Sequence, residues 1–72
     1  MNFTPWFPGA DKPVRRGVYQ RQFSTNKTVY ERYCYWSGEN WYMSDTTPDQ
    51  AMEWVQSGPA ARQSLPWRGV LK

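Results

Sequence analysis

Histidine is absent from this chain of 72 residues, and cysteine occurs only once, as Cys34. The chain therefore lacks the side chain that most often serves as a general base near neutral pH. A single thiol cannot form a disulfide within the chain, and a structural zinc site needs four nitrogen or sulfur ligands. The sequence thus predicts no metal site and no cofactor, and it argues against an enzyme.

Long apolar segments are also missing. No stretch approaches the roughly 20 apolar residues of a transmembrane helix. Residues 1–9 lack the basic start and the apolar run of a signal peptide. Because a lone thiol is typical of a reducing compartment, we expect a cytoplasmic protein with no membrane partner.

Aromatic side chains are abundant, with five Trp, five Tyr and three Phe. A domain this small buries only about 60% of the surface that its unfolded chain exposes, so its core is marginal. Each packed ring buries roughly 150–250 Å². We therefore expect residues 1–72 to form one small domain whose rings replace the missing disulfides and metal.

Composition divides the first part of the chain into an arm and a sheet. Residues 1–13 hold three prolines, which predicts an extended arm that docks Trp6 and Phe7 on the domain. Residues 17–44 alternate turn-like stretches with β-branched and aromatic runs, which predicts a three-stranded antiparallel β-meander. Its expected strands are residues 17–23, 28–36 and 41–44.

A helix is predicted over residues 47–57. Thr47 can cap its amino end, Pro48 suits the first helical position, and Gln50 falls where a capping box places Glu or Gln. Gly58 is expected to end the helix as a left-handed cap. Such a short helix must pack on the sheet to be stable, so the fold class is α+β, with one short helix on one face of the sheet. Residues 58–72 follow as a docked tail.

Side chains alternate along a strand, so the meander has two distinct faces. We name the first the tryptophan face and expect Met52 and Val55 of the helix to cover it. The second, the tyrosine face, is either covered by the arm or the tail or left open to bind a partner. The expected members of the tryptophan face are Tyr19, Phe23, Cys34, Trp36, Trp41 and Met43. Those of the tyrosine face are Val18, Val29, Tyr33, Tyr35 and Tyr42.

Two binding hypotheses follow. In the first, a protein partner docks on Tyr33, Tyr35 and Tyr42, or on Trp67 and Arg68 of the tail, since such residues are favoured at interfaces. The tail pair has an alternative role, in which Trp67 packs on the domain and Arg68 lies over a ring. Cys34 is expected to be a buried, unreactive thiol.

The second hypothesis is nucleic-acid binding, which a net charge of +3 permits. Arginines interleaved with aromatic residues on a small sheet can contact phosphates while the rings stack on bases. The same arginines can equally be solubilising charges around an aromatic core. The candidate residues are Arg15, Arg16, Arg21 and Arg32.

Residues 32–42 read Arg-Tyr-Cys-Tyr-Trp-Ser-Gly-Glu-Asn-Trp-Tyr. This run resembles the Tyr-Trp-Asp-Gly-x-x-Trp hairpins of short bacterial and phage domains, with Ser37 in place of the usual aspartate. With residues 17–19 and 65–69, the chain is similar to small uncharacterised phage and prophage proteins. The resemblance implies an accessory role that acts by binding a host or virion protein, and it implies no particular functional residue. We expect a monomer or a weak homodimer, since the short third strand could leave an edge open.

Overall fold

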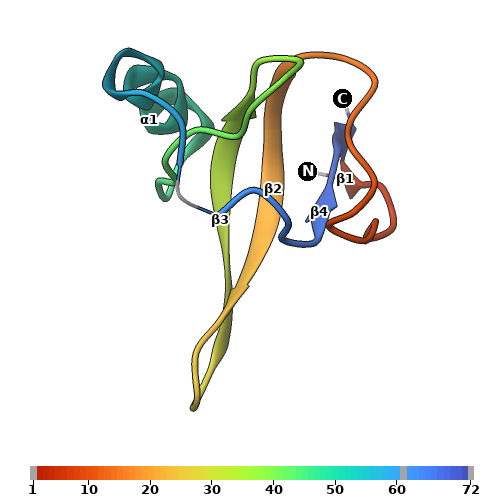
Figure 1. Cartoon of the computed structure of the whole chain (residues 1–72). Coiled ribbons are helices and arrows are strands. Elements are labelled where there is room, and N and C mark those ends of the chain that lie inside the picture. The colour runs from red at the N-terminus through yellow and green to blue at the C-terminus, as the bar shows by residue number, and fades with distance from the viewer. Residues whose placement is uncertain (1, 61, 72) are drawn as a thin grey trace.

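The computed structural model describes residues 2–60 and 62–71 and has an α+β fold (Figure 1). Its three-stranded antiparallel sheet has the order β3-β2-β4. The short helix α1 packs mainly against β3 and to a lesser extent against β2. The predicted fold class, with three antiparallel strands and one short helix, is confirmed. The strands are β1 (Asn2–Phe3), β2 (Gly17–Ser24), β3 (Val29–Trp36), β4 (Trp67–Arg68) and β5 (Val70–Leu71).

The hairpin of β2 and β3 is the longest feature of the fold, and its tip projects from the rest of the molecule (Figure 1). The two strands pair along their whole length, from Gly17 opposite Trp36 to Ser24 opposite Val29. The pairing places Tyr19 opposite Cys34. These two members of the predicted tryptophan face therefore lie on the same side of the hairpin, as the predicted division into two faces requires.

The third strand of the sheet differs from the prediction for residues 41–44. Trp41 bridges to Trp36 and Asp45 bridges to Tyr33, so this segment does run antiparallel beside β3. Between these bridges Met43 and Ser44 together face the single residue Cys34, which is the arrangement of a β-bulge. The bulge interrupts the ladder, and the third strand is instead β4, which pairs with β2.

The helical segment begins and ends at the predicted residues. Helix α1 spans Pro48–Glu53 and continues as a 3₁₀ turn, η1, over Trp54–Ser57. The Thr47 hydroxyl accepts a hydrogen bond from the Gln50 amide at 3.2 Å. Gly58 ends η1 with a φ of +89° and a ψ of 171°. This conformation favours glycine, but it is not the left-handed helical cap that the sequence predicts.

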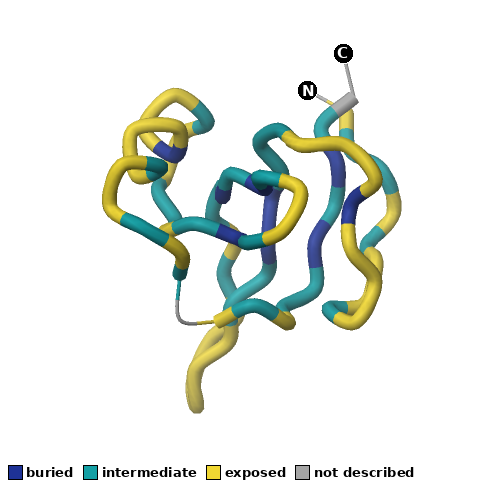
Figure 2. Tube along the Cα trace, turned by 45° about the horizontal axis from the view of Figure 1, so that its top comes forward, coloured by how far each residue is buried: buried dark blue, intermediate teal, exposed yellow. Residues whose placement is uncertain are grey.

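The core lies on the tryptophan face. Cys34, Trp36, Trp41 and Trp67 form one buried cluster, with Tyr19 and Phe23 packed against it. Figure 2 shows the buried positions on the central strands and on the neighbouring C-terminal segment. The prediction that Met52 covers this face is wrong, because Met52 is 48% exposed and Trp67 of the tail occupies the cluster.

The arm and the tail close over this core together. Phe7 stacks on Trp67 with ring centroids 4.7 Å apart. Their backbones exchange two hydrogen bonds, of 2.8 and 3.1 Å. Two carbonyl oxygens of the arm also accept hydrogen bonds from core tryptophans. The Pro13 carbonyl accepts from the indole N–H of Trp36, and the Asp11 carbonyl accepts from that of Trp67. The predicted docking of the arm is therefore confirmed for Phe7.

A glycine allows the arm to approach the tail closely. A Cβ atom built on Gly9 would lie 2.1 Å from the backbone oxygen of Ser64. No other residue fits there without moving one of the two segments.

Arg68 of β4 also packs on the arm. Its guanidinium lies 3.9 Å from the ring centre of Phe3 and 4.5 Å from that of Trp6.

We predict that Trp67→Ala removes most of the stability of the domain. Truncating a buried tryptophan typically costs about 3–5 kcal/mol, which is comparable to the whole stability of a domain this small. Urea denaturation followed by circular dichroism measures the change. Val14→Ala is the control, because Val14 is 98% exposed and should change the unfolding free energy by less than about 0.5 kcal/mol. Equal midpoints for the two variants would contradict the assignment of Trp67 to the core.

Candidate functional site

The described part of the chain has a pocket of about 160 Å³, which we call the Tyr42 pocket. A second hollow, of about 230 Å³, is lined by residues 62–65. The Tyr42 pocket lies between β2, the bulged segment beside β3 and the segment that follows η1. Residues from distant parts of the sequence therefore meet there. The lining residues are Arg21, Phe23, Tyr42, Met43, Ser44, Ala60 and Arg62.

Each wall of the pocket is positioned by a feature of the backbone. Arg21 and Phe23 are two residues apart on β2, so their side chains leave the same face of the strand. The bulge opposite Cys34 supplies the second wall, and Met43 there is 44% exposed. The third wall begins at Ala60, whose amide donates to the carbonyl of Trp41 at 2.8 Å.

The side chain of Gln63 holds this third wall in place. Its Oε1 accepts from the Trp41 amide at 2.7 Å, and its Nε2 donates to the Trp41 carbonyl at 3.0 Å. The same Nε2 also donates to the Ala60 carbonyl at 2.6 Å. One amide side chain thus fastens the segment after η1 to the segment that bears Tyr42.

Arg21 is a cation within the core, with 0% of its surface exposed. Its Nη2 donates to the Arg62 carbonyl at 2.9 Å, and its Nη1 lies 3.8 Å from Sγ of Cys34. The guanidinium also lies 4.6 Å from the ring centre of Trp41. Burial lowers the pKa of Arg21 from its ordinary value, but a guanidinium stays protonated at neutral pH.

Cys34 is buried beside this arginine. Burial raises the pKa of the Cys34 thiol, and the nearby Arg21 charge only partly opposes that effect. The thiol is therefore protonated at neutral pH, whereas nucleophilic attack requires the thiolate. Its environment matches the unreactive thiol that the sequence predicts. Across the residues described, no three or more acidic or cysteine side chains are grouped so that they could hold a metal ion.

The structure brings two of the tyrosines proposed to bind a protein together, Tyr35 and Tyr42, whereas the tail pair, Trp67 and Arg68, lies in β4. Tyr33, Tyr35 and Tyr42 are all half-buried, and the rings of Tyr35 and Tyr42 lie 5.9 Å apart. Of these three, only Tyr42 lines the pocket. Trp67 is 7% exposed and belongs to the core. Arg68 lies over two rings of the arm, so the tail pair takes the packed alternative.

The arginines proposed to bind nucleic acid do not gather on one open surface. Arg15 and Arg16 are exposed and precede β2. Arg21 and Arg32 are neighbours across β2 and β3, but Arg21 is fully buried. The guanidinium of Arg32 lies 4.7 Å from the ring centre of Tyr30.

The sequence reasoning missed the walls of the pocket. Phe23 and Met43 were expected in the core, and Ala60 and Arg62 were treated only as part of a tail. No local pattern indicates the bulge that turns Met43 outward. Only the docking of the segment after η1 brings Arg62 to Arg21, and that contact joins positions far apart in the sequence.

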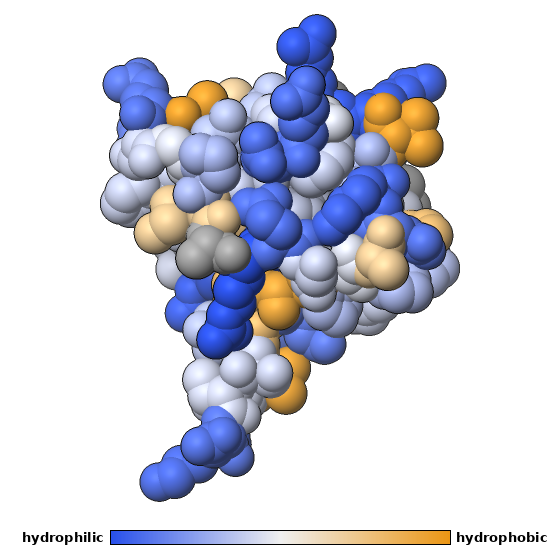
Figure 3. Space-filling model, in the orientation of Figure 1, coloured by the Kyte–Doolittle hydropathy of each residue, from blue (hydrophilic) through white to orange (hydrophobic). Residues whose placement is uncertain are grey.

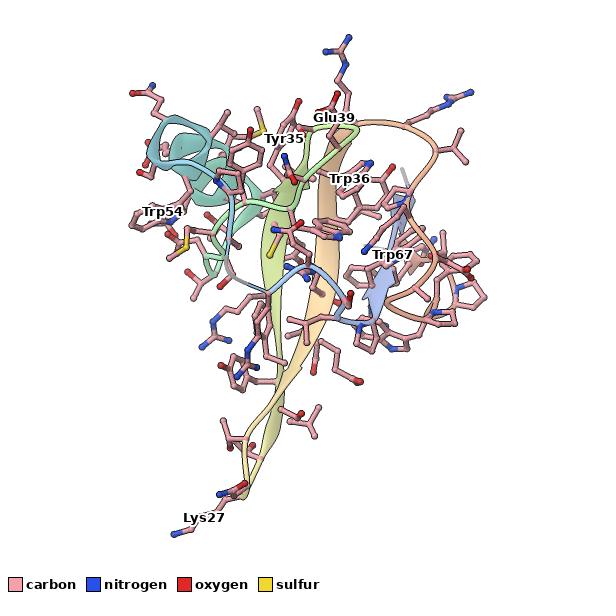
Figure 4. The ribbon with its side chains drawn as sticks, in the orientation of Figure 1. Lys27, Tyr35, Trp36, Glu39, Trp54 and Trp67 are labelled. Atoms are coloured by element: carbon pink, nitrogen blue, oxygen red, sulfur yellow. The ribbon has the colours of Figure 1, made fainter. Side chains whose placement is uncertain are left out.

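A second polar contact fastens the helical segment to β3. Asp45 exchanges two backbone hydrogen bonds with Tyr33. Its Oδ2 accepts from the Trp54 indole at 2.8 Å, and its Oδ1 accepts from the Thr46 amide at 2.7 Å. These bonds, above all that from Trp54, lower the pKa of Asp45. Figure 4 shows Trp54 on the flank beside α1, with β3 and β2 between it and Trp67.

In comparisons with known proteins, no family model, curated protein or solved structure matches this chain. Within the described residues, no helix is both long enough and apolar enough to cross a membrane.

We predict that the Asp45 carboxyl titrates below its ordinary pKa of 3.8, and that Trp54→Phe raises its pKa toward that value. A lowered folded-state pKa stabilises the fold above the unfolded-state pKa, and this contribution is lost as the pH falls through the folded value. Carboxyl carbon shifts in an NMR pH titration measure the pKa directly. Trp6→Phe serves as the control because Trp6 contacts Arg68 and not Asp45. An unchanged Asp45 pKa in Trp54→Phe would show that the indole does not hold the carboxylate.

Proposed function

We propose that this chain is a non-catalytic protein-binding module that receives one side chain of its partner in the Tyr42 pocket. The observation that carries the proposal is the size of the pocket, about 160 Å³. An apolar cavity of about 150 Å³ holds one benzene molecule, whereas pockets for drug-sized ligands measure about 300–1,000 Å³. A single side chain fits this volume better than a metabolite does.

The residue types around the pocket support a protein partner. Tyr, Phe, Met and Arg are enriched in the cores of protein interfaces relative to the rest of the surface, and Phe23, Tyr42, Met43 and Arg62 line this pocket. Figure 3 shows apolar atoms in small, separate patches among hydrophilic ones on the face that it views. A partner that anchors one side chain in a small pocket needs no broad apolar patch.

The resemblance to small phage and prophage proteins supports the class of partner. We propose that the module acts as an accessory factor on a host or virion protein. Nucleic-acid binding is the alternative, and the burial of Arg21 weighs against it. Proteins contact an extended phosphate backbone through exposed basic grooves. A fully buried arginine therefore does not reach the phosphates.

We predict that peptides selected from a random library on this protein lose at least about tenfold in affinity for Met43→Glu. A charged side chain at the half-exposed Met43 would disturb the apolar wall of the pocket, and losses of this size are typical where an anchoring contact is removed. The matched control is Val14→Glu, which adds the same charge at a fully exposed position outside the pocket. Fluorescence anisotropy measures affinity, and circular dichroism confirms that both variants are folded.

Two outcomes of the selection would contradict the proposed function. Selected peptides that bind Met43→Glu and Val14→Glu equally well would overturn the assignment of the pocket. Failure to select any peptide, combined with salt-sensitive binding of single-stranded oligonucleotides, would favour the nucleic-acid alternative.

A further inference from the structure

Strand β3 has an uncovered outer edge near the tip of the hairpin. One side of β3 pairs with β2, and on the other side the segment of residues 41–45 reaches only as far as Tyr33, which bridges to Asp45. Within the described part of the chain, nothing pairs with the outer side of residues 29–32, which we call the free edge. Proteins usually blunt such an edge with a proline or a bulge. Residues 29–32 contain no proline, and the bulge lies farther along, at Cys34.

The backbone bonds of Tyr33 show which groups of the free edge point outward. Tyr33 exchanges two backbone hydrogen bonds with Asp45, so its N–H and C=O groups point away from β2. Alternate residues of an antiparallel strand point their backbone groups to the same side, so those of Glu31 and Val29 also point outward. The N–H groups of both have no acceptor among the described residues. The Glu31 carbonyl accepts from the Arg32 guanidinium at 2.9 Å and keeps a second lone pair.

The free edge is complementary to itself. Val29 and Glu31 flank Tyr30 in the strand, so a two-fold axis beside Tyr30 would place Val29 of one copy opposite Glu31 of the other. Every outward N–H group of the two edges would then meet an outward carbonyl oxygen, as in an antiparallel ladder. Two-fold symmetric pairing of identical surfaces is the commonest basis of homodimers.

The projecting shape of the hairpin leaves room for a second copy. Strand β3 runs from Val29 near the hairpin tip to Trp36 within the rest of the molecule (Figure 1). The antiparallel strand of a second copy runs in the opposite direction, so the bulk of each copy would lie beyond the tip of the other. Because the free edge is short, the buried area stays below that of a stable dimer.

The side chains of the free edge favour the same pairing. Val29, which is 56% exposed, would cover the stem of Glu31 from the other copy. The two Tyr30 rings would form an aromatic cross-strand pair, which extends the stack of Tyr30 on Phe23 at 5.6 Å. Lys27 lies at the tip (Figure 4) and would approach Glu31 of the other copy diagonally. The two Glu31 carboxylates are also diagonal neighbours, and their repulsion keeps the association weak.

We propose that the chain forms a weak, reversible homodimer in which the free edges of two copies pair antiparallel about Tyr30. The expected dissociation constant is about 0.1–1 mM, as for a small interface. No residue that lines the Tyr42 pocket belongs to the free edge. Self-association therefore goes beyond the proposed binding of a partner side chain, and neither proposal depends on the other.

Two substitutions of Val29 test the pairing. Val29→Lys places a cation directly opposite Glu31 of the other copy, in both halves of the dimer, and should tighten the dimer about three- to tenfold. Val29→Glu places a like charge there and should weaken the dimer by a similar factor. General repulsion between copies of this basic chain predicts the reverse order, because lysine adds to the net positive charge and glutamate reduces it. Val14→Lys and Val14→Glu are the matched controls, since Val14 is 98% exposed and lies outside the free edge.

Sedimentation equilibrium at up to about 2 mM protein, above the expected dissociation constant, measures the dimer, and circular dichroism confirms that the variants are folded. An NMR dilution series locates the interface. The amide signals of Val29 and Glu31 should shift with concentration more than those of Tyr30 and Arg32, whose amides pair with β2. A monomer at every concentration, or shifts centred outside residues 29–32, would overturn the proposal. Val29→Lys that dimerises no more tightly than Val29→Glu would overturn it as well.

Discussion

The packing of Trp67 against Phe7, Tyr19 and Trp41 is the contact on which the rest of the structure depends. These rings lie 4.7, 5.3 and 6.4 Å from that of Trp67, in one stacked, one edge-on and one tilted pair. They join the arm, the hairpin and the tail, the parts of the chain that are farthest apart in sequence. With one cysteine and no histidine, the domain uses these aromatic contacts where other small domains use disulfides or zinc.

The features that could be predicted from the sequence are those with a local cause. The turns and alternating side chains give the β2–β3 hairpin, and Thr47, Pro48 and Gly58 give the limits of the helical segment. The cover of the tryptophan face could not be predicted in this way. It depends on a two-residue strand, Trp67–Arg68, that forms only when the tail returns to β2, and no periodicity exists in so short a segment.

The same limit applies to the site. Tyr42 was singled out because tyrosine is common at interfaces, but its neighbours in the pocket arise from a bulge and from a docked loop. Arg21 was singled out as a candidate nucleic-acid contact, but its burial becomes apparent only once the tail and the segment after η1 are placed against β2. One side of the hairpin thus serves the fold, while the Tyr42 pocket opens beside it, with Met43 and Arg62 among its lining residues.

Amide hydrogen exchange tests most directly whether the arm and the tail are part of the cooperative fold. The amides of Phe7 and Trp67 donate to each other's carbonyls, and those of Tyr19 and Cys34 belong to the centre of the hairpin. We predict that all four exchange with similar protection, near that set by global unfolding. Rapid exchange at Phe7 and Trp67 with slow exchange at Tyr19 and Cys34 would contradict the account, because the hairpin would then fold without its aromatic cover.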